Sequence, residues 1–432
     1  MGRVDLEAAL RREIGARTDA LVALTQALVR IPTVNPPGDK YREACELIAA
    51  YLEPMGFACR LLRATGTPGD SERHPRWNLL ARREGTRPGR CLHVNGHIDV
   101  VEVGQGWTRD PFGAELADGR IYGRGSCDMK GGLAAAIVAV EAWLALHPDW
   151  PGAIEISATG DEETGGYGGV AWLAEQGAFA AVDHVIIPEP LNKDRICLGH
   201  RGVWWAELET KGRIAHGSMP FLGDCAIRHM GAVLAEIEET LLPALAARRT
   251  AMPVVPEAAR ASTLNINSLH GGQAEPEAGF TGLPSPVVPD RARMVIDRRF
   301  LAEEDLVSVK AEFRAMLDRA TARRPFRWSL RDLFEVQPSL TDRDAPVVTA
   351  LSAAIGQALG RPPAYVVSPG TYDQKHLDRI GRVRNCVAYG PGILDLAHQP
   401  DEYVGVADML DSALVIGLAM SDLLEPPAEV AA

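Results

Sequence analysis

Apolar residues recur at helical spacing over residues 5–31 and again over residues 41–56, which read YREACELIAAYLEPMG. A spacing of three and four residues places such positions on one face of a helix, so both stretches are predicted to be helices. The first ends before the proline-rich loop IPTVNPPG, and Pro54 and Gly56 end the second. Residues 129–147, MKGGLAAAIVAVEAWLALH, are apolar on every face and predict a buried helix.

Short apolar runs alternate with these helices and predict strands. The runs are RWNLLARRE (76–84), RCLHVNGHIDVV (90–101), AIEISATG (153–160) and HVIIPEP (184–190). Such strand–helix alternation is typical of α/β proteins, whose strands run parallel between two layers of helices. We therefore expect an α/β fold with a mixed, mostly parallel sheet and helices on both faces.

The pattern changes at about Gly202. Four stretches then alternate polar and apolar residues, GVWWAELETKG, STLNINSL, ARMVIDRRF and FRWSL, with helical patterns after the first and the third. This order predicts a small α+β module of the ferredoxin-like kind. Because strand–helix alternation resumes after about Thr341, we predict one domain from residues 1–201 and 336–432 and an inserted domain over 202–335.

Composition and charge limit the possible functions. The chain has 432 residues, of which 46% are hydrophobic, and a net charge of −12, which argues against a nucleic-acid-binding protein. The seven cysteines are scattered and odd in number, as expected for reduced thiols in the cytoplasm. The N-terminal stretch is charged, and no apolar run approaches the ~20 residues of a membrane span, so we expect neither a signal peptide nor a membrane partner.

Polar side chains stand where the predicted strands end. His97 and Asp99 occupy one face of the otherwise apolar strand HVNGHIDVV. Other acidic and imidazole groups follow strands or precede a helix: Asp128 in GRGSCDMKGG, Glu162 and Glu163 in GDEETGG, Glu189 in PEP and His398 in LAHQPDEYV. Ligands bind beyond the carboxyl ends of strands in open parallel sheets, so these groups are expected to converge.

Carboxylates this close repel one another unless a cation lies between them, and a pair of metal ions is the simplest answer. Two divalent cations would balance a bridging hydroxide and three carboxylates, those of Asp128, Glu163 and Glu189, with His97 and His398 as neutral ligands. Mixed nitrogen and oxygen ligands suit Zn²⁺, and also Co²⁺ or Mn²⁺.

Asp99 is predicted to accept the second imidazole N–H of His97, which fixes the tautomer of that ligand. Singly, each of these features has an ordinary alternative: a satisfied core histidine, a helix cap or a solvated acidic pair.

Together the motifs resemble one family. GHIDVV, WTRDPFGAELADGRIYGRGSCDMKGG, GDEETGG, PEP, AHGS and AHQPDEYV occur in this order between about residues 96 and 404. They are similar to the M20 metallopeptidases and deacylases, which include acetylornithine deacetylase, succinyl-diaminopimelate desuccinylase, aminoacylase-1 and carboxypeptidase G. The resemblance implies a di-zinc peptidase-like catalytic domain with an inserted lid and dimerisation domain.

The resemblance also implies a role for each polar residue. One metal would be held by His97 and Glu189, the other by Glu163 and His398, and Asp128 would bridge them. Glu162 would be the general base that takes a proton from the metal-bound water and delivers it to the leaving amine. Its alternative is a second carboxylate that only tunes the local field.

Residues of the inserted domain are implied to contact the substrate. His216 in AHGS would stabilise the oxyanion, often from a partner subunit, which implies a homodimer packed through the lid; its alternative is a loop histidine. Asn265 and Arg298 fall near positions that grip a substrate carboxylate, with Arg299 as the alternative arginine and a structural role equally open.

The late stretch SPGTYDQKHLDRIG matches the family only in part. Gly370 and Thr371 match a substrate loop, whereas Tyr372, Gln374 and Lys375 depart from the deacetylase-like and desuccinylase-like versions. These departures leave the substrate more open than the reaction.

We therefore predict a metal-dependent amidohydrolase in which a metal-bridging hydroxide attacks the amide of a small N-acyl amino acid or N-acyl amine. Within the same chemistry, the alternatives are a dipeptidase or carboxypeptidase and a deformylase acting on an N-formyl aminopyrimidine. A non-catalytic metal-binding protein that keeps the fold is the alternative of a different class.

Overall fold

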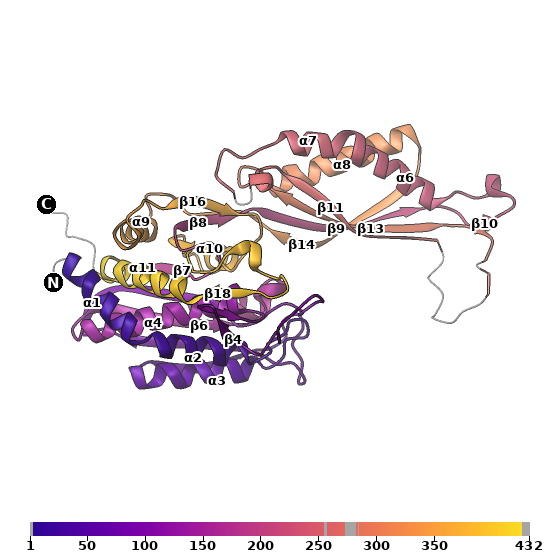
Figure 1. Ribbon diagram of the computed structural model, residues 1–432. Coiled ribbons are helices and arrows are strands. Elements are labelled where there is room, and N and C mark those ends of the chain that lie inside the picture. The colour runs from indigo at the N-terminus through magenta and orange to yellow at the C-terminus, as the bar shows by residue number, and fades with distance from the viewer. Residues whose placement is uncertain (1–2, 255–256, 273–281, 284, 426–432) are drawn as a thin grey trace. The chain divides into compact units, whose positions relative to one another are not determined.

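The computed structural model describes residues 3–254, 257–272, 282–283 and 285–425 of the chain (Figure 1). These residues form two compact units. Unit 1 contains the described residues up to Gly199, then Thr341–Val366, and those from Tyr372 onward; unit 2 contains His200–Leu340 and Val367–Thr371. Unit 2 is therefore slightly wider than the predicted inserted domain over 202–335, and it includes part of the predicted substrate loop.

Unit 1 contains the helices α1 (Arg3–Ala16), α2 (Thr18–Val29), α3 (Tyr41–Leu52), α4 (Gly131–Leu146), α5 (Trp172–Glu175), α9 (Pro346–Leu359), α10 (Gln374–Arg379) and α11 (Val406–Leu424). Its strands are β1 (Ala58–Ala64), β2 (Arg76–Glu84), β3 (Arg87–His97), β4 (Glu115–Ala117), β5 (Arg120–Tyr122), β6 (Pro151–Thr159), β7 (His184–Ile187), β8 (Arg195–His200), β16 (Ala364–Ser368), β17 (Cys386–Ala388) and β18 (Tyr403–Gly405). The last residue of β8 and the last two residues of β16 are already counted in unit 2.

The main sheet of unit 1 is mixed, with its parallel part at the centre. Its order runs β1-β2-β6-β3-β7-β17-β8, with β16 paired to β8. Strands β6, β3, β7 and β17 run parallel to one another, whereas the pairs β1–β2, β2–β6 and β17–β8 are antiparallel. The parallel centre matters for function because it directs the carboxyl ends of β6, β3 and β7 toward the same edge.

Helices cover both faces of this sheet, as the strand–helix alternation predicts. On one face, Leu133 of α4 packs so closely on β3 that a Cβ at Gly96 would lie 2.9 Å from its Cδ1. On the other face, the neighbouring Asn95 donates a hydrogen bond to Asp373, next to α10. Consecutive residues of β3 therefore point to opposite layers, apolar on the α4 side and polar on the α10 side.

Helix α4 is buried on all sides over residues 131–140. The helical stretch Ser126–Leu146 is long and apolar enough to cross a membrane by length and composition, yet 83% of that apolar window is buried inside the described structure. The helix packs against α1, α2 and α11. The stretch is thus a core helix of unit 1.

Unit 2 is an antiparallel sheet with helices along one face (Figure 1). Its long strands follow the order β11-β13-β9-β14, and the core lies between them and the helices. The elements are β9 (Gly202–Lys211), β10 (Ala215–His216), α6 (Ala226–Glu236), α7 (Leu242–Ala247), β11 (Thr263–Gly271), β12 (Val287–Val288), β13 (Arg291–Phe300), α8 (Leu306–Arg323), β14 (Arg327–Val336) and β15 (Ser339–Leu340).

Helix α8 illustrates how the sequence produces this packing. The side chain of Asp305 accepts a hydrogen bond from the backbone N–H of Ser308 and so caps the first turn. Leu306, Val309 and Phe313 then recur at helical spacing and are buried in the core of unit 2.

Candidate metal centre and active site

The polar residues of unit 1 meet because three adjacent parallel strands end at the same edge of the sheet. His97 is the last residue of β3, Glu162 and Glu163 form a short turn after β6, and Glu189 follows β7. Asp128 lies in the turn just before α4. His398 reaches the same place from the loop before β18, with φ of +63°, a conformation that costs a non-glycine residue energy and is common at functional sites.

These side chains form two groups of potential metal ligands that share Asp128. In one group, Nε2 of His97 lies 3.1 Å from Oδ1 of Asp128 and 4.0 Å from Oε1 of Glu189. In the other, Nε2 of His398 lies 3.4 Å from Oδ2 of Asp128 and 3.2 Å from Oε1 of Glu163. Each oxygen of the Asp128 carboxylate thus faces a different histidine, as a bridging ligand requires.

The pKa values show how strongly these groups interact. Burial raises the pKa of Glu163 to about 7, although the hydrogen bond with His398 lowers it. Burial and the charge of Asp128 also raise the pKa of Glu189 well above its usual value. Hydrogen bonds to Asp128 and Glu163 raise the pKa of His398 to about 11. Burying these carboxyl groups side by side therefore disfavours their charged forms, and a cation bound among them would reverse that effect.

The donor set fits a pair of metal ions. Two imidazoles and three carboxylates provide mixed nitrogen and oxygen ligands, which suit zinc and similar divalent ions. In each group the potential ligand atoms all lie within 4.8 Å of one another. A cation between them would relieve the repulsion among the carboxylates.

Asp99 contacts the site differently from the prediction. Nδ1 of His97 lies 3.0 Å from the backbone carbonyl of Asp99 and 3.6 Å from its carboxylate, so the carbonyl is the nearer acceptor. The carboxylate instead accepts the backbone N–H groups of Glu162 and Glu163, at 3.2 and 3.1 Å, and the side chain of Asn35 at 2.9 Å. Asp99 therefore fixes the His97 tautomer with its backbone and the turn after β6 with its side chain.

A buried ion pair that the sequence did not reveal holds the Asp128 turn. Oε1 of Glu402 accepts the backbone N–H groups of Gly125, Cys127 and Asp128, at 3.0, 2.9 and 3.1 Å. Its Oε2 binds the guanidinium of Arg124 at 2.6 Å, and both side chains are almost fully buried. Both residues lie within the motifs that supply ligands, Glu402 in AHQPDEYV with His398 and Arg124 in GRGSCDMKGG with Asp128. Their place in these motifs is the one sequence feature that could have drawn attention to them.

The same arginine also reaches the His398 loop. Nη2 of Arg124 donates to the carbonyl of His398 at 3.2 Å. Arg124 and Glu402 therefore tie together the two segments that supply Asp128 and His398, and we expect them to preserve the distance between these two ligands.

The predicted substrate contacts all belong to unit 2, whereas the metal ligands belong to unit 1. His216 is an exposed residue of β10, and its Nδ1 lies 2.7 Å from the hydroxyl of Ser218. Asn265 is an exposed residue of β11 and donates to Asn267 at 2.8 Å. The backbone N–H of Gly370 donates to Ser368 at 3.2 Å, and Thr371 is the last residue of unit 2.

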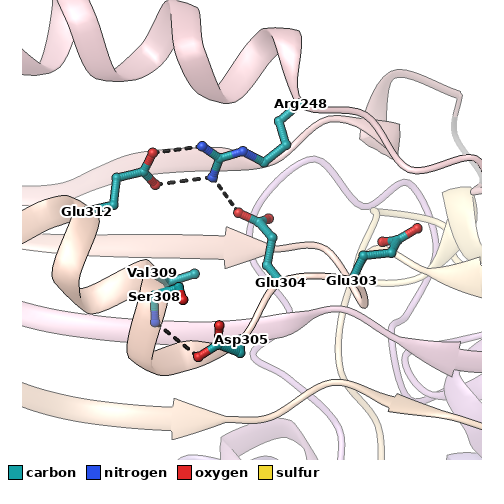
Figure 2. A pocket seen from close by; sticks show the side chains of 7 residues that line it. All are labelled: Arg248, Glu303, Glu304, Asp305, Ser308, Val309 and Glu312. Carbon is teal, nitrogen blue, oxygen red and sulfur yellow. Dashed lines mark hydrogen bonds and ion pairs between the residues drawn. The ribbon is translucent and has the colours of Figure 1, made fainter.

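The two candidate arginines of β13 have different surroundings. Arg298 is buried, and its guanidinium binds Glu304 at 3.0 Å and the backbone carbonyl of Arg299. Glu304 also binds Arg248, which lies between Glu304 and Glu312 in Figure 2. A substrate carboxylate would have to displace Glu304 to reach Arg298. Arg299 is more exposed and pairs with Asp297 at 2.7 Å.

Comparison with known proteins agrees with the resemblance of the motifs. The model of the family described as peptidase family M20/M25/M40 matches residues 93–422. A succinyl-diaminopimelate desuccinylase from Methylobacillus flagellatus is 33% identical over 389 residues, which cover 88% of this chain and 93% of that protein.

Solved structures show the same fold. The crystal structure of human carnosine dipeptidase 1 superposes with a TM-score of 0.74 at 20% identity and covers 97% of this chain and 98% of its own. A dinuclear metal-binding peptidase of the M20 family from Bacillus subtilis superposes with a TM-score of 0.66 at 16% identity, covering 95% of this chain and 99% of its own. Both support a mixed α/β fold for the chain.

Proposed function

Because the chain belongs to peptidase family M20/M25/M40, whose members hydrolyse carbon–nitrogen bonds, we propose that it removes the acyl group from a small N-acylated amino acid. The observation that carries this proposal is the pair of ligand groups sharing Asp128, with Glu162 beside them. The substrate class is supported by the desuccinylases, whose sequences match over most of both chains.

His97 and Glu189 would hold one divalent ion, and Glu163 and His398 would hold the other. Asp128 would bind both ions. Zn²⁺ is the proposed metal, with Co²⁺ or Mn²⁺ as substitutes, because all three accept this donor set. When bound, such a pair polarises the substrate carbonyl and makes a water molecule more acidic. The distances within each group support this assignment.

Glu162 is the proposed general base. It belongs to neither ligand group, yet it precedes Glu163 directly, and its backbone is fixed by Asp99. Its carboxylate would accept a proton from the attacking water and deliver it to the nitrogen of the leaving amine. Protonation of that nitrogen is necessary because an amide anion is a very poor leaving group.

A metal-exchange assay tests the function. The purified protein is stripped with a chelator, reloaded with Zn²⁺, Co²⁺ or Mn²⁺, and offered N-succinyl, N-acetyl and N-formyl amines and dipeptides. We expect hydrolysis of N-succinyl amino acids that disappears with the chelator and returns with the metal. Absence of hydrolysis on every compound of the panel, in protein shown to bind two ions per chain, would contradict the proposal.

His216 is proposed to stabilise the oxyanion of the tetrahedral intermediate. Its exposed position on β10 supports this role, because the imidazole is accessible to a ligand. We expect His216→Ala to lower kcat by about 10²-fold or more, because an oxyanion donor acts mainly in the transition state. The measurement is steady-state kinetics on the best panel substrate; a change in KM alone would reassign His216 to substrate binding.

We also propose a cytoplasmic homodimer that pairs through unit 2. Large apolar side chains are exposed near β10 and the start of α6: Ile214, Met219, Phe221, Leu222 and Ile227. Burying them against a second copy would remove this apolar surface from water. Light scattering of the purified protein tests the dimer. The cytoplasmic location is supported by the seven cysteines, all of which are free thiols, because disulfides are rare in that compartment.

A further inference from the structure

The segment Tyr372–His376 is polar, yet every one of its side chains is buried. Asp373 and Gln374 are each 1% exposed and Lys375 is 3% exposed. Burying such groups is unfavourable unless each one has hydrogen-bonding or ionic partners. The partners of this segment therefore reveal its role, which the motif comparison left open because the segment departs from the family pattern.

The first part of the segment is anchored to the sheet. The amide Nε2 of Gln374 donates to three acceptors at 3.2, 3.0 and 2.9 Å: the carbonyl of Leu198, the hydroxyl of Thr341 and the carbonyl of Cys386. Oδ2 of Asp373 accepts a hydrogen bond of 2.9 Å from Asn95, which lies on β3 on the same face as His97. The segment is thus fixed to the strand that carries a predicted metal ligand.

The second part of the segment lies against the turn after β6. Nζ of Lys375 donates to Oε1 of Glu162 at 3.1 Å, and Nε2 of His376 lies 2.7 Å from the carbonyl of Gly165. A Cβ at Gly166 would lie only 2.9 Å from Oδ1 of Asp373, so glycine is needed for this close approach. The turn that carries Glu162 is therefore held at two points, through the Glu162 side chain by Lys375 and through the backbone carbonyl of Gly165 by His376.

We propose that Lys375 is a positioning residue that fixes the orientation of the Glu162 carboxylate. The ammonium binds Oε1, so Oε2 would be the oxygen that accepts the proton of the attacking water. A charge-assisted hydrogen bond between two groups that are 3% and 10% exposed restricts the carboxylate more than a solvated contact would. This inference rests on the proposed function, since it assigns Lys375 a role through Glu162.

A direct substrate contact is the competing role for Lys375. Burial lowers the pKa of Lys375, but the charges of Glu162 and Asp373 outweigh it and raise the pKa above its usual value, so the side chain is an ammonium. That ammonium already has a carboxylate partner and is almost inaccessible to solvent. A substrate anion would have to compete with Glu162 for it, which favours the positioning role.

Kinetics of three variants test the proposal. The zinc-loaded protein is assayed on N-succinyl-diaminopimelate, or otherwise on the best amide of the panel. Lys375→Met should lower kcat by about 10²-fold with KM unchanged, because small displacements of a catalytic group have effects of this size. Lys375→Arg should recover most of the lost kcat, because a guanidinium also donates to Oε1. Lys310→Met, which removes an ammonium bound to Asp332 and Glu335 in unit 2, should keep both constants.

Zinc content and a double variant complete the test. All variants should bind as much zinc as the wild type, and Lys375→Met should cause no further loss of kcat when added to Glu162→Gln. A raised KM with wild-type kcat, an undiminished kcat, or an additive loss in the double variant would overturn the positioning role. If Lys375→Met does not fold, Lys375→Gln replaces it, with the same outcomes.

The Glu162→Gln variant separates the two proposals. Wild-type turnover in Glu162→Gln would overturn the proposed base. An inactive Glu162→Gln beside a fully active Lys375→Met would overturn only the role of Lys375.

Discussion

Glu162→Gln is expected to bind zinc like the wild type and to lower kcat by about 10³-fold or more, the range of general acid–base catalysis. Glutamine has nearly the same shape, and its carbonyl oxygen can still accept the hydrogen bond from Lys375. It cannot take up the proton of the attacking water at neutral pH. Because Glu162 belongs to neither ligand group, its replacement should not change the affinity for metal.

Glu163→Gln provides the matched control, since it makes the same chemical change one residue away. Glu163 lies 3.2 Å from His398 within a ligand group, so this variant should lose zinc as well as activity. Metal analysis by mass spectrometry and initial rates at saturating substrate distinguish the two variants. If Glu162→Gln kept wild-type kcat, or if it lost zinc as Glu163→Gln does, Glu162 would not be the base.

The convergence of the candidate ligands could be predicted from the sequence because most of these residues lie at strand ends. Once β3, β6 and β7 are recognised as parallel strands, their carboxyl ends must share an edge, which brings His97, Glu163 and Glu189 together. Local patterns were sufficient for this step because polar residues after an apolar run are visible without knowledge of the fold. The direction of the outer strands was not visible, since an antiparallel β1 or β2 shows the same apolar pattern as a parallel strand.

The residues that hold the site were harder to predict. Glu402 binds the Asp128 turn across more than 270 residues of sequence, and its burial depends on Arg124 being buried with it. Lys375 likewise becomes meaningful only when α10 is placed against the turn of Glu162. A charged residue in a polar stretch is usually exposed, so neither its burial nor its partner can be inferred from spacing alone.

Arg298 shows the same limit in unit 2. Strand alternation predicts that Arg298 and Arg299 face opposite sides, and the structure buries Arg298 while leaving Arg299 partly exposed. The sequence could not indicate that Glu304, just after the strand, binds the buried guanidinium. From the sequence alone, a role of Arg298 in binding substrate could therefore not be distinguished from a structural ion pair with Glu304.

Asp128→Asn is expected to weaken the binding of both metal ions, because Asp128 is the residue common to the two ligand groups. The amide can offer one carbonyl oxygen to one ion, but its nitrogen cannot ligate the other. We expect the zinc affinity to fall by more than the 10- to 100-fold that is typical when a residue supporting a ligand is changed. Isothermal titration with zinc, together with kcat at saturating zinc, measures both effects.

Glu402→Gln is the graded comparison, since it perturbs the Asp128 turn without removing a ligand. The zinc affinity of Glu402→Gln should fall by about 10- to 100-fold. At saturating zinc, the kcat of Glu402→Gln should recover, whereas the kcat of Asp128→Asn should stay low. Breaking the buried ion pair with Arg124 should also lower the free energy of unfolding by about 3–5 kcal/mol. The zinc titrations of Glu402→Gln should therefore be carried out at a temperature well below the Tm of this variant. Among the described residues, Asp128 is the one that belongs to both ligand groups, with one oxygen near His97 and the other near His398. Equal zinc affinities for Asp128→Asn and the wild type would therefore contradict a bridging role for Asp128.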